Sequence, residues 1–123
     1  MKSSLAPLQF SLLTIRASDL ERSARFYAAL GLEFHRHRHG AGAVHLSADC
    51  DGLVFEIYPD HPPDPPTRST RLGFRVADLE AATQRLIAAG GRLVSRPSGA
   101  EWGERSVIAD PDGHRVELLA TSP

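Results

Sequence analysis

Cysteine, lysine and long apolar runs are almost absent from this sequence. A single cysteine, Cys50, among 123 residues excludes an intrachain disulfide and a cysteine-based zinc site. No stretch approaches the ~18 consecutive apolar residues that span a membrane. The first residues also hold no apolar segment as long as a secretory signal needs. These absences predict a cytoplasmic protein with no membrane partner.

The sequence also has no large excess of positive or negative charge. The formal net charge is −1, whereas a protein that binds nucleic acid carries a strongly basic face, so we expect no nucleic-acid partner. Of the 14 basic residues, all but Lys2 are arginines, which pair with carboxylates through two hydrogen bonds and tolerate partial burial better than lysine. The length and the apolar fraction of 41% are those of one globular domain, spanning residues 1–123.

What the sequence does contain is an internal repeat at an offset of 59 residues. Residues 16–21 (RASDLE) return as residues 75–80 (RVADLE). Each copy has a short apolar run, an acidic helix start and a helical pattern that ends at a glycine, Gly31 in the first copy and Gly90 in the second. The repeat therefore predicts two modules of the same architecture.

The two predicted helices begin at capping residues. Ser18 and Glu21 have the spacing of a capping box, and Asp78 is a typical N-cap residue. Three strand-like stretches follow each helix, separated by turns rich in glycine and aspartate. The expected strands are residues 10–17, 33–39, 43–48 and 53–58 in the first module, and residues 72–76, 92–95, 105–109 and 114–119 in the second.

A proline-rich segment separates the two copies. Residues 59–66 hold five of the nine prolines, and because such a run stays extended and does not pair in a sheet, we expect residues 59–69 to be a linker. The fold expected is α+β. Two βαβββ modules, at about residues 8–58 and 70–119, would form a curved, partly open mixed sheet around a concave cavity.

Two motifs, DLERSARFYAALGL at residues 19–32 and DPDGHRVEL at residues 110–118, together with the repeat, resemble the vicinal oxygen chelate superfamily. That superfamily includes glyoxalase I, extradiol dioxygenases, fosfomycin-resistance enzymes and bleomycin-binding resistance proteins. The similarity covers residues 10–119. It implies a small-molecule ligand and, because small members commonly pair, a homodimer whose cavities are formed by one chain or shared by two.

The resemblance also implies where a metal ion would be held. Metal-using members carry a histidine on the first strand of each module and a glutamate on one or both last strands. The glutamate positions match Glu56 and Glu117, whereas the histidine positions match Leu12 and Arg71. Leucine supplies no lone pair, and arginine does not lose its proton. We therefore expect no cofactor and no family-type metal, with Arg71 neutralising one of the glutamates.

Further residues are expected to line the cavity. Arg16 and Arg75 follow the metal positions Leu12 and Arg71 by an even number of residues, so their side chains would point to the same face of the strand. There they would help to neutralise a glutamate. His45 either faces the cavity or is a partly buried, hydrogen-bonded histidine. Tyr58 would offer its phenol to a ligand. Trp102 either stacks on a ligand at the pocket mouth or packs on its own module.

Three other features have a functional and a structural interpretation. His35, His37 and His39 share one face of a predicted strand, as either a surface metal clip or a solvated strand edge. His114 stands beside the last hairpin turn and is expected to serve that turn. Cys50 has no neighbouring base that would activate its thiolate.

Three functions remain open. The first is a protein that sequesters a small molecule without a metal, which Leu12 and Arg71 favour. The second is a glyoxalase- or dioxygenase-type enzyme in which Glu56 and Glu117 hold a divalent zinc, nickel, iron or manganese ion. There, waters or His45 would complete the shell and one glutamate would move a proton. The third is a metal-free lyase or epimerase with Glu117 as base and Arg71 stabilising an enolate.

Overall fold

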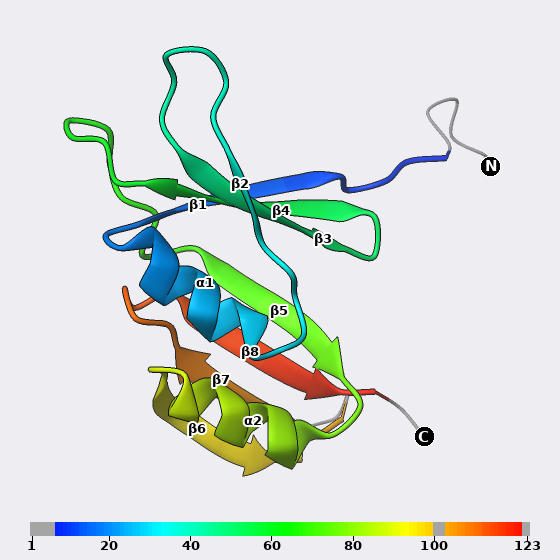
Figure 1. Cartoon of the computed structure of the whole chain (residues 1–123). Coiled ribbons are helices and arrows are strands. Elements are labelled where there is room, and N and C mark those ends of the chain that lie inside the picture. Colours follow the sequence, from blue (N-terminus) through cyan, green and yellow to red (C-terminus); the bar gives the residue numbers. More distant parts are fainter. Residues whose placement is uncertain (1–6, 100–102, 122–123) are drawn as a thin grey trace.

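The computed structural model describes residues 7–99 and 103–121 and contains the βαβββ unit twice (Figure 1). The expected order of elements and the α+β class are confirmed. None of the described helices is long and apolar enough to cross a membrane. The first module comprises β1 (Leu12–Ala17), α1 (Leu20–Ala28), β2 (His35–His37), β3 (His45–Cys50) and β4 (Leu53–Pro59). The second comprises β5 (Arg71–Val76), α2 (Leu79–Ala88), β6 (Arg92–Ser98), β7 (Arg105–Ala109) and β8 (Arg115–Ala120).

Each module has its own four-stranded mixed sheet. The strand order is β1-β4-β3-β2 in the first sheet and β5-β8-β7-β6 in the second. The first and last strands of each module pair in parallel, and the remaining neighbours pair antiparallel. Strands β1 and β5 therefore lie at an edge of their sheets, so neither sheet is closed.

Several element boundaries differ from the sequence expectation. Strand β2 has three residues instead of the seven predicted at 33–39, because its partner β3 begins only at His45 and offers three positions for pairing. Strand β6 is longer than expected and reaches Ser98, with two register shifts against β7. The first strand begins at Leu12 instead of residue 10.

The helix starts confirm one capping prediction and correct the other. Asp19, not Ser18, is the N-cap of α1, and its carboxylate accepts the backbone N–H three residues on at 3.1 Å. Ser18 instead donates a hydrogen bond of 2.6 Å to Asp112 in the last hairpin turn, so no capping box forms. Asp78 caps α2 as expected, at 3.0 Å.

Helix α1 joins the two modules through one hydrophobic core. Its Tyr27 is fully buried and has ring contacts at 4.9 Å with Phe55 of the first sheet and at 6.3 Å with Phe74 of the second. Figure 1 shows α1 beside both sheets. Gly91 permits this approach, because an added Cβ would lie 2.6 Å from the ring of Phe26, well inside van der Waals contact.

A network of buried hydrogen bonds also connects the two modules next to α1. The Tyr27 hydroxyl donates a hydrogen bond of 2.7 Å to Asp110, whose carboxylate also lies 2.9 Å from Nδ1 of His114. The other ring nitrogen of His114 lies 2.8 Å from the Thr67 hydroxyl in the linker. His114 serves the last turn as expected, since its N–H donates to Asp110 at 2.9 Å, and it also ties that turn to the linker.

This network changes the ionisation of its members. Burial alone would raise the pKa of Asp110, but the hydrogen bonds from His114 and Tyr27 outweigh it and lower the pKa below its usual range. Burial, reinforced by the Asp110 carboxylate, raises the pKa of Tyr27 far above its usual value. Asp110 is therefore an anion in the folded protein at neutral pH, and Tyr27 is a neutral donor.

Candidate functional site

Each sheet has one face that packs on the core and one that faces away from it. Helix α1 packs against the first sheet and α2 against the second. Strand register places the remaining residues on what we call the first and second open faces. The first open face carries Leu12, Thr14, Arg16, His35, His37, His45, Ser47, Asp49, Val54, Glu56 and Tyr58. The second carries Arg71, Gly73, Arg75, Arg92, Ser95, Ser98, Arg105, Val107, Ala109, Arg115, Glu117 and Leu119.

Glu56 lies in the middle of the first open face, on β4. The Thr14 hydroxyl donates a hydrogen bond of 2.8 Å to Oε1 of Glu56, and Nε2 of His45 lies 4.0 Å from its Oε2. Sequence reasoning did not find Thr14, although its spacing of two residues from Leu12 on one strand was a usable signal. The structure thus assembles a carboxylate, a hydroxyl and an imidazole from three adjacent strands.

Of the two roles expected for His45, the structure shows the buried, hydrogen-bonded one. Its side chain is buried, and Nδ1 lies 3.2 Å from the carbonyl oxygen of Ala43. Because a carbonyl only accepts, Nδ1 donates to it, and Nε2 lies on the side of Tyr58 and Glu56. The ring stacks on Tyr58 at 4.1 Å between centroids, with the Tyr58 hydroxyl 3.4 Å from Nε2.

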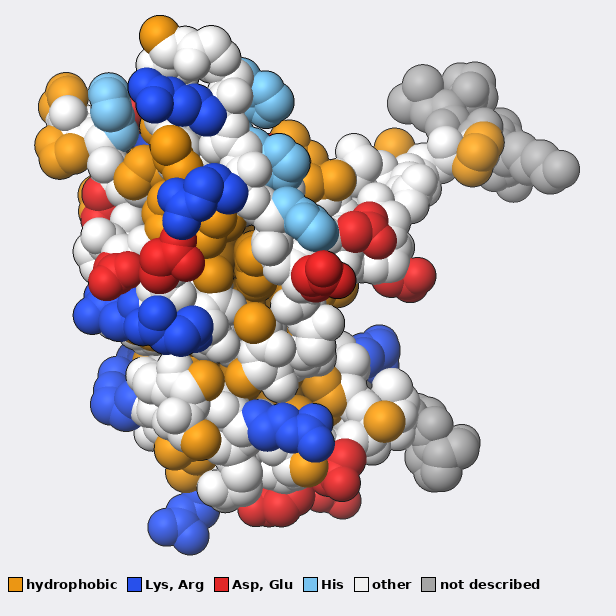
Figure 2. Space-filling view, in the orientation of Figure 1, with side chains coloured by type: hydrophobic (Ala, Val, Ile, Leu, Met, Phe, Trp, Pro, Cys, Tyr) orange, Lys and Arg blue, Asp and Glu red, His pale blue; other side chains and the backbone are white. Residues whose placement is uncertain are grey.

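Further histidines extend this stack along the sheet. The ring centroids of His37 and His39 lie 5.6 and 5.3 Å from that of His45. Figure 2 shows histidine side chains following one another along the first module. His35 lies apart, exposed beside Glu33. Within residues 7–99 and 103–121, no three His, Cys, Asp or Glu side chains are arranged to hold a metal ion, so the metal-clip interpretation gains no support.

Glu117 lies on the second open face between two guanidinium groups. Arg105 donates a hydrogen bond of 3.2 Å to Oε2 of Glu117, and Nη2 of Arg71 lies 3.6 Å from the same oxygen. The ion pair expected between Arg71 and a glutamate is thus present, with a longer approach than a hydrogen bond. Arg105, which sequence reasoning missed, makes the closer contact.

The remaining predicted site residues lie in different surroundings. Arg16 binds the linker instead of a glutamate, since its guanidinium donates to the carbonyl of Pro59 at 2.9 Å. Leu12 is about half exposed on the first open face. Arg75 is exposed and lines a hollow of about 220 Å³ on the second face, together with Glu117. Trp102 lies outside the described residues.

Cys50 shows no sign of activation. Burial raises the pKa of its thiol, and the nearby carboxylates of Asp51 and Asp49 raise it further. A raised pKa leaves less of the nucleophilic thiolate at neutral pH. The structure therefore agrees with a cysteine that takes no part in chemistry.

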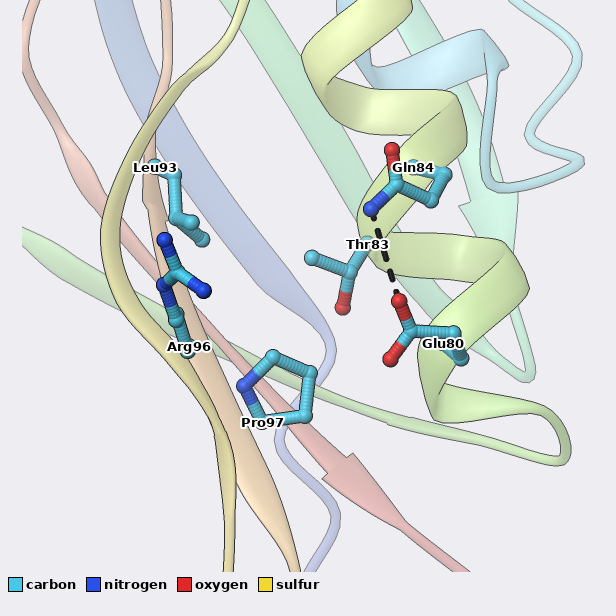
Figure 3. Close-up of a pocket in the computed structure, with 6 residues that line it drawn as sticks. All are labelled: Glu80, Thr83, Gln84, Leu93, Arg96 and Pro97. Atoms are coloured by element: carbon cyan, nitrogen blue, oxygen red, sulfur yellow. Dashed lines mark hydrogen bonds between the residues drawn. The ribbon is translucent and has the colours of Figure 1, made fainter.

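A separate hollow lies between α2 and β6, away from both open faces. Its volume is about 420 Å³. Figure 3 shows that three of its lining residues come from the helix and three from the strand, namely Glu80, Thr83, Gln84, Leu93, Arg96 and Pro97. Its Glu80 carboxylate already accepts a hydrogen bond of 3.4 Å from Gln84. This hollow contains none of the residues that the sequence singled out.

Comparison with known proteins yields a family. The model of the Glyoxalase/Bleomycin resistance protein/Dioxygenase superfamily matches residues 9–118. Among curated relatives, the chain is 26% identical over 120 residues to a probable lactoylglutathione lyase of Synechocystis sp.. That alignment covers 88% of this chain and 92% of the relative.

Solved structures agree with the sequence match. TnmS3, an antibiotic binding protein from Streptomyces sp. CB03234, superposes with a TM-score of 0.73 at 25% identity, covering 96% of this chain and 99% of TnmS3. A glyoxalase-related enzyme from Fulvimarina pelagi also superposes with a TM-score of 0.73 at 25% identity, covering 92% and 88%. Proteins of this architecture thus include a binder and an enzyme-related protein.

Proposed function

Because the chain belongs to the glyoxalase/bleomycin resistance protein/dioxygenase superfamily, we propose that it binds a small molecule on its open faces without the metal ion of its metal-using relatives. One observation carries the proposal. Where those relatives would place histidines, this chain has Leu12 and Arg71, and the guanidinium of Arg71 lies 3.6 Å from Glu117. The expected place of action is the cytoplasm.

The donor set argues against the family-type metal site. Leu12 has no donor atom, and the guanidinium of Arg71 stays protonated and repels a cation. The Glu117 carboxylate is already approached by two guanidinium groups. Glu56 remains as a carboxylate ligand, with His45 4.0 Å away. No third His, Cys, Asp or Glu among the described residues is arranged with these two, whereas a structural zinc site uses four protein ligands and a catalytic one three.

The first open face offers contacts that suit a neutral or aromatic part of a ligand. The ring of Tyr58, backed by the buried His45, lies on one side of Glu56, and the exposed apolar side chains of Leu12 and Val54 lie on the other. Aromatic rings prefer such offset or edge contacts with other rings. The antibiotic-binding relative TnmS3 supports a binding function for this architecture.

A second copy of the chain would complete the cavity. Glu56 and Glu117 lie on separate sheets, and β1 and β5 are sheet edges. Apolar residues at the start of the chain are left uncovered, with Leu8 88% and Phe10 70% exposed. A symmetric homodimer that placed the first open face of one copy against the second open face of the other would cover these residues and enclose a ligand.

One observation favours a competing function. The Synechocystis relative is named a probable lactoylglutathione lyase, and the approach of His45 to Glu56 provides a base beside a hydrogen-bonded carboxylate. A divalent metal-dependent lyase, isomerase or dioxygenase that uses Glu56 and Glu117 is therefore the alternative. It requires that a metal displace the guanidinium groups from Glu117.

Metal analysis separates the two functions. The full chain would be dialysed separately against nickel, zinc, iron and manganese salts, freed of excess ion and analysed for metal. We expect substoichiometric content for each ion. The double variant Leu12→His with Arg71→His is the positive control and should retain one ion per chain if the open faces come together. Stoichiometric metal in the unmodified protein, lost on Glu117→Gln, would contradict the proposal and support the enzyme.

A further inference from the structure

The second open face is unusually rich in arginine. Strand register places four arginines on this side of β5, β7 and β8, and only one acidic residue, Glu117, stands among them. The four arginines are Arg71, Arg75, Arg105 and Arg115. Arginine stays charged throughout the pH range in which proteins fold. Arg92 of β6 pairs with Ala109 on the same side, so five positive charges and one negative charge leave the four strands of this face with a net charge of +4.

Glu117 does not balance this charge. Arg105 and Arg71 both approach its Oε2, at 3.2 and 3.6 Å, so the one carboxylate is shared between two guanidinium groups. Like charges that face each other across neighbouring strands destabilise a sheet. Arg71 and Arg115 are such neighbours in the β5–β8 register. A bound anion would relieve this repulsion.

A buried side-chain nitrogen of Arg115 lacks a hydrogen-bond partner among the described residues. This atom, Nη1, is covered by protein atoms. Most buried polar atoms in proteins do have a partner. Arg115 adds its positive charge to this face next to Arg71, with which it pairs in the register. A carboxylate or phosphate oxygen is the acceptor that a guanidinium binds most strongly.

The face also provides space beside these charges. Gly73 lies opposite Glu117 in the register of β5 and β8. An added Cβ at Gly73 would meet only the carbonyl oxygen of Glu117, at 4.0 Å, so core packing does not require a glycine there. The hollow of about 220 Å³ extends from Gly73 to Arg75, Glu117 and the apolar Leu119. It can take a compact group that is charged on one side and apolar on the other.

We infer that the second open face binds the oxyanion, a carboxylate or phosphate, of a small organic acid. This inference rests on the proposed binding function and names the class of its ligand. Arg75, which lines the hollow, receives the oxyanion, the other arginines of the face add positive charge, and Leu119 contacts the apolar body. The planar guanidinium groups suit two-point hydrogen bonding to such an anion.

The test uses benzoate and inorganic phosphate as probes, with uncharged benzamide as the matched compound. Each would be titrated into the isotopically labelled full chain at low salt while backbone amide resonances are followed. Benzoate or phosphate should cause saturable shifts concentrated in β5 and β8. Benzamide should bind at least about tenfold more weakly, as expected when a charge-assisted hydrogen bond is lost. If the two anions cause no saturable shifts in β5 and β8, the inference is wrong.

Variants assign the binding to the arginines. Arg75 is exposed, so Arg75→Gln should fold normally and weaken benzoate binding about tenfold, whereas Arg75→Lys keeps the charge and should lose less. Arg25→Gln, on the exposed side of α1, is the control and should leave binding unchanged. Equal effects of Arg75→Gln and Arg25→Gln would show general charge attraction and overturn the assigned site.

The same titrations distinguish failure of the inference from failure of the proposed function. Tighter binding of benzamide than of benzoate in β5 and β8 would overturn the oxyanion class while keeping a small-molecule site on this face. Stoichiometric metal in the unmodified protein would overturn the metal-free function regardless of the benzoate result. The oxyanion class of the ligand and the metal-free function are therefore tested by separate measurements.

Discussion

Arg105 donates a hydrogen bond of 3.2 Å to Glu117, on the oxygen that Arg71 approaches to 3.6 Å. In a metal-using relative a divalent cation would stand next to this carboxylate. Here two guanidinium groups surround it, and further arginines lie on the same open face. This arrangement links the missing histidines to the proposed metal-free binding of an anion.

Removing the carboxylate should strengthen anion binding. Glu117 lines the same hollow as Arg75, and its negative charge repels an anion there, so Glu117→Gln should bind benzoate several-fold more tightly than the unmodified chain. Folding should be slightly less favourable, because Arg71 and Arg105 each lose their ion pair with Glu117. Calorimetric titration with benzoate measures the first effect. Weaker benzoate binding by Glu117→Gln would mean that the carboxylate takes part in holding the ligand.

Arg71→Ala tests how much the ion pair contributes to folding. The Arg71 side chain is 62% exposed and the Glu117 side chain 27%, and exposed ion pairs contribute below ~1 kcal/mol. Urea unfolding should therefore show a loss below ~1 kcal/mol in the free energy of unfolding. A loss on the order of 3–5 kcal/mol would identify a buried pair and imply that a second copy covers this face.

Tyr27→Phe tests the buried junction between the modules. The substitution removes the hydrogen bond of 2.7 Å to Asp110 while keeping the ring packing. Hydrogen bonds to buried charged groups contribute about 1.5–3 kcal/mol, and urea unfolding should show a loss of that size. Tyr58→Phe is the control, because its 3.4 Å contact with His45 is longer, and it should cost less.

The same carboxylate predicts a pH dependence of stability. The pKa of Asp110 is lower in the folded protein than its unfolded value of about 3.9. Its contribution to stability is therefore full above the unfolded pKa and is lost as the pH falls through the folded pKa. Asp110→Asn should be less stable at neutral pH and lose less stability on acidification. Parallel acid-unfolding curves for the two proteins would contradict this cause.

Gly91→Ala should destabilise the protein through overpacking. The added Cβ would lie 2.6 Å from the Phe26 ring and 2.7 Å from the backbone carbonyl of Leu86, so neither can yield easily. Overpacking of this kind costs about 1–3 kcal/mol. Gly73→Ala is the matched control, with its nearest contact at 4.0 Å. It should unfold nearly as the parent does and bind benzoate more weakly, because its methyl group enters the hollow.

The order of elements could be predicted because it depends on local signals that occur twice. Helix starts, glycines and turns recur at an offset of 59 residues. Each of these signals depends only on residues a few positions away in the sequence. The exact residue that caps a helix was harder to predict. Ser18 was expected to cap α1, but Asp19 does so because Ser18 is engaged by Asp112, which lies in the other module.

Contacts within the candidate site depend on long-range packing that the sequence does not reveal. The alternation of side chains along β1 correctly places Arg16 on the open face. Its guanidinium contacts Pro59, however, because the linker packs back along β1. Arg105 reaches Glu117 only because of the β7–β8 register. Glu56 and Glu117 lie on separate sheets because each module forms its own sheet, as the repeat predicts.

The most direct test of the central claim is the dissociation constant of benzoate, measured on the full chain in excess EDTA and again with added zinc or nickel. If a guanidinium surface takes the place of the metal, the constant in EDTA should equal that of the untreated protein, and the added ions should not tighten binding. Binding that disappears in EDTA and returns with a divalent ion would contradict the account and assign the site to a metal-dependent protein.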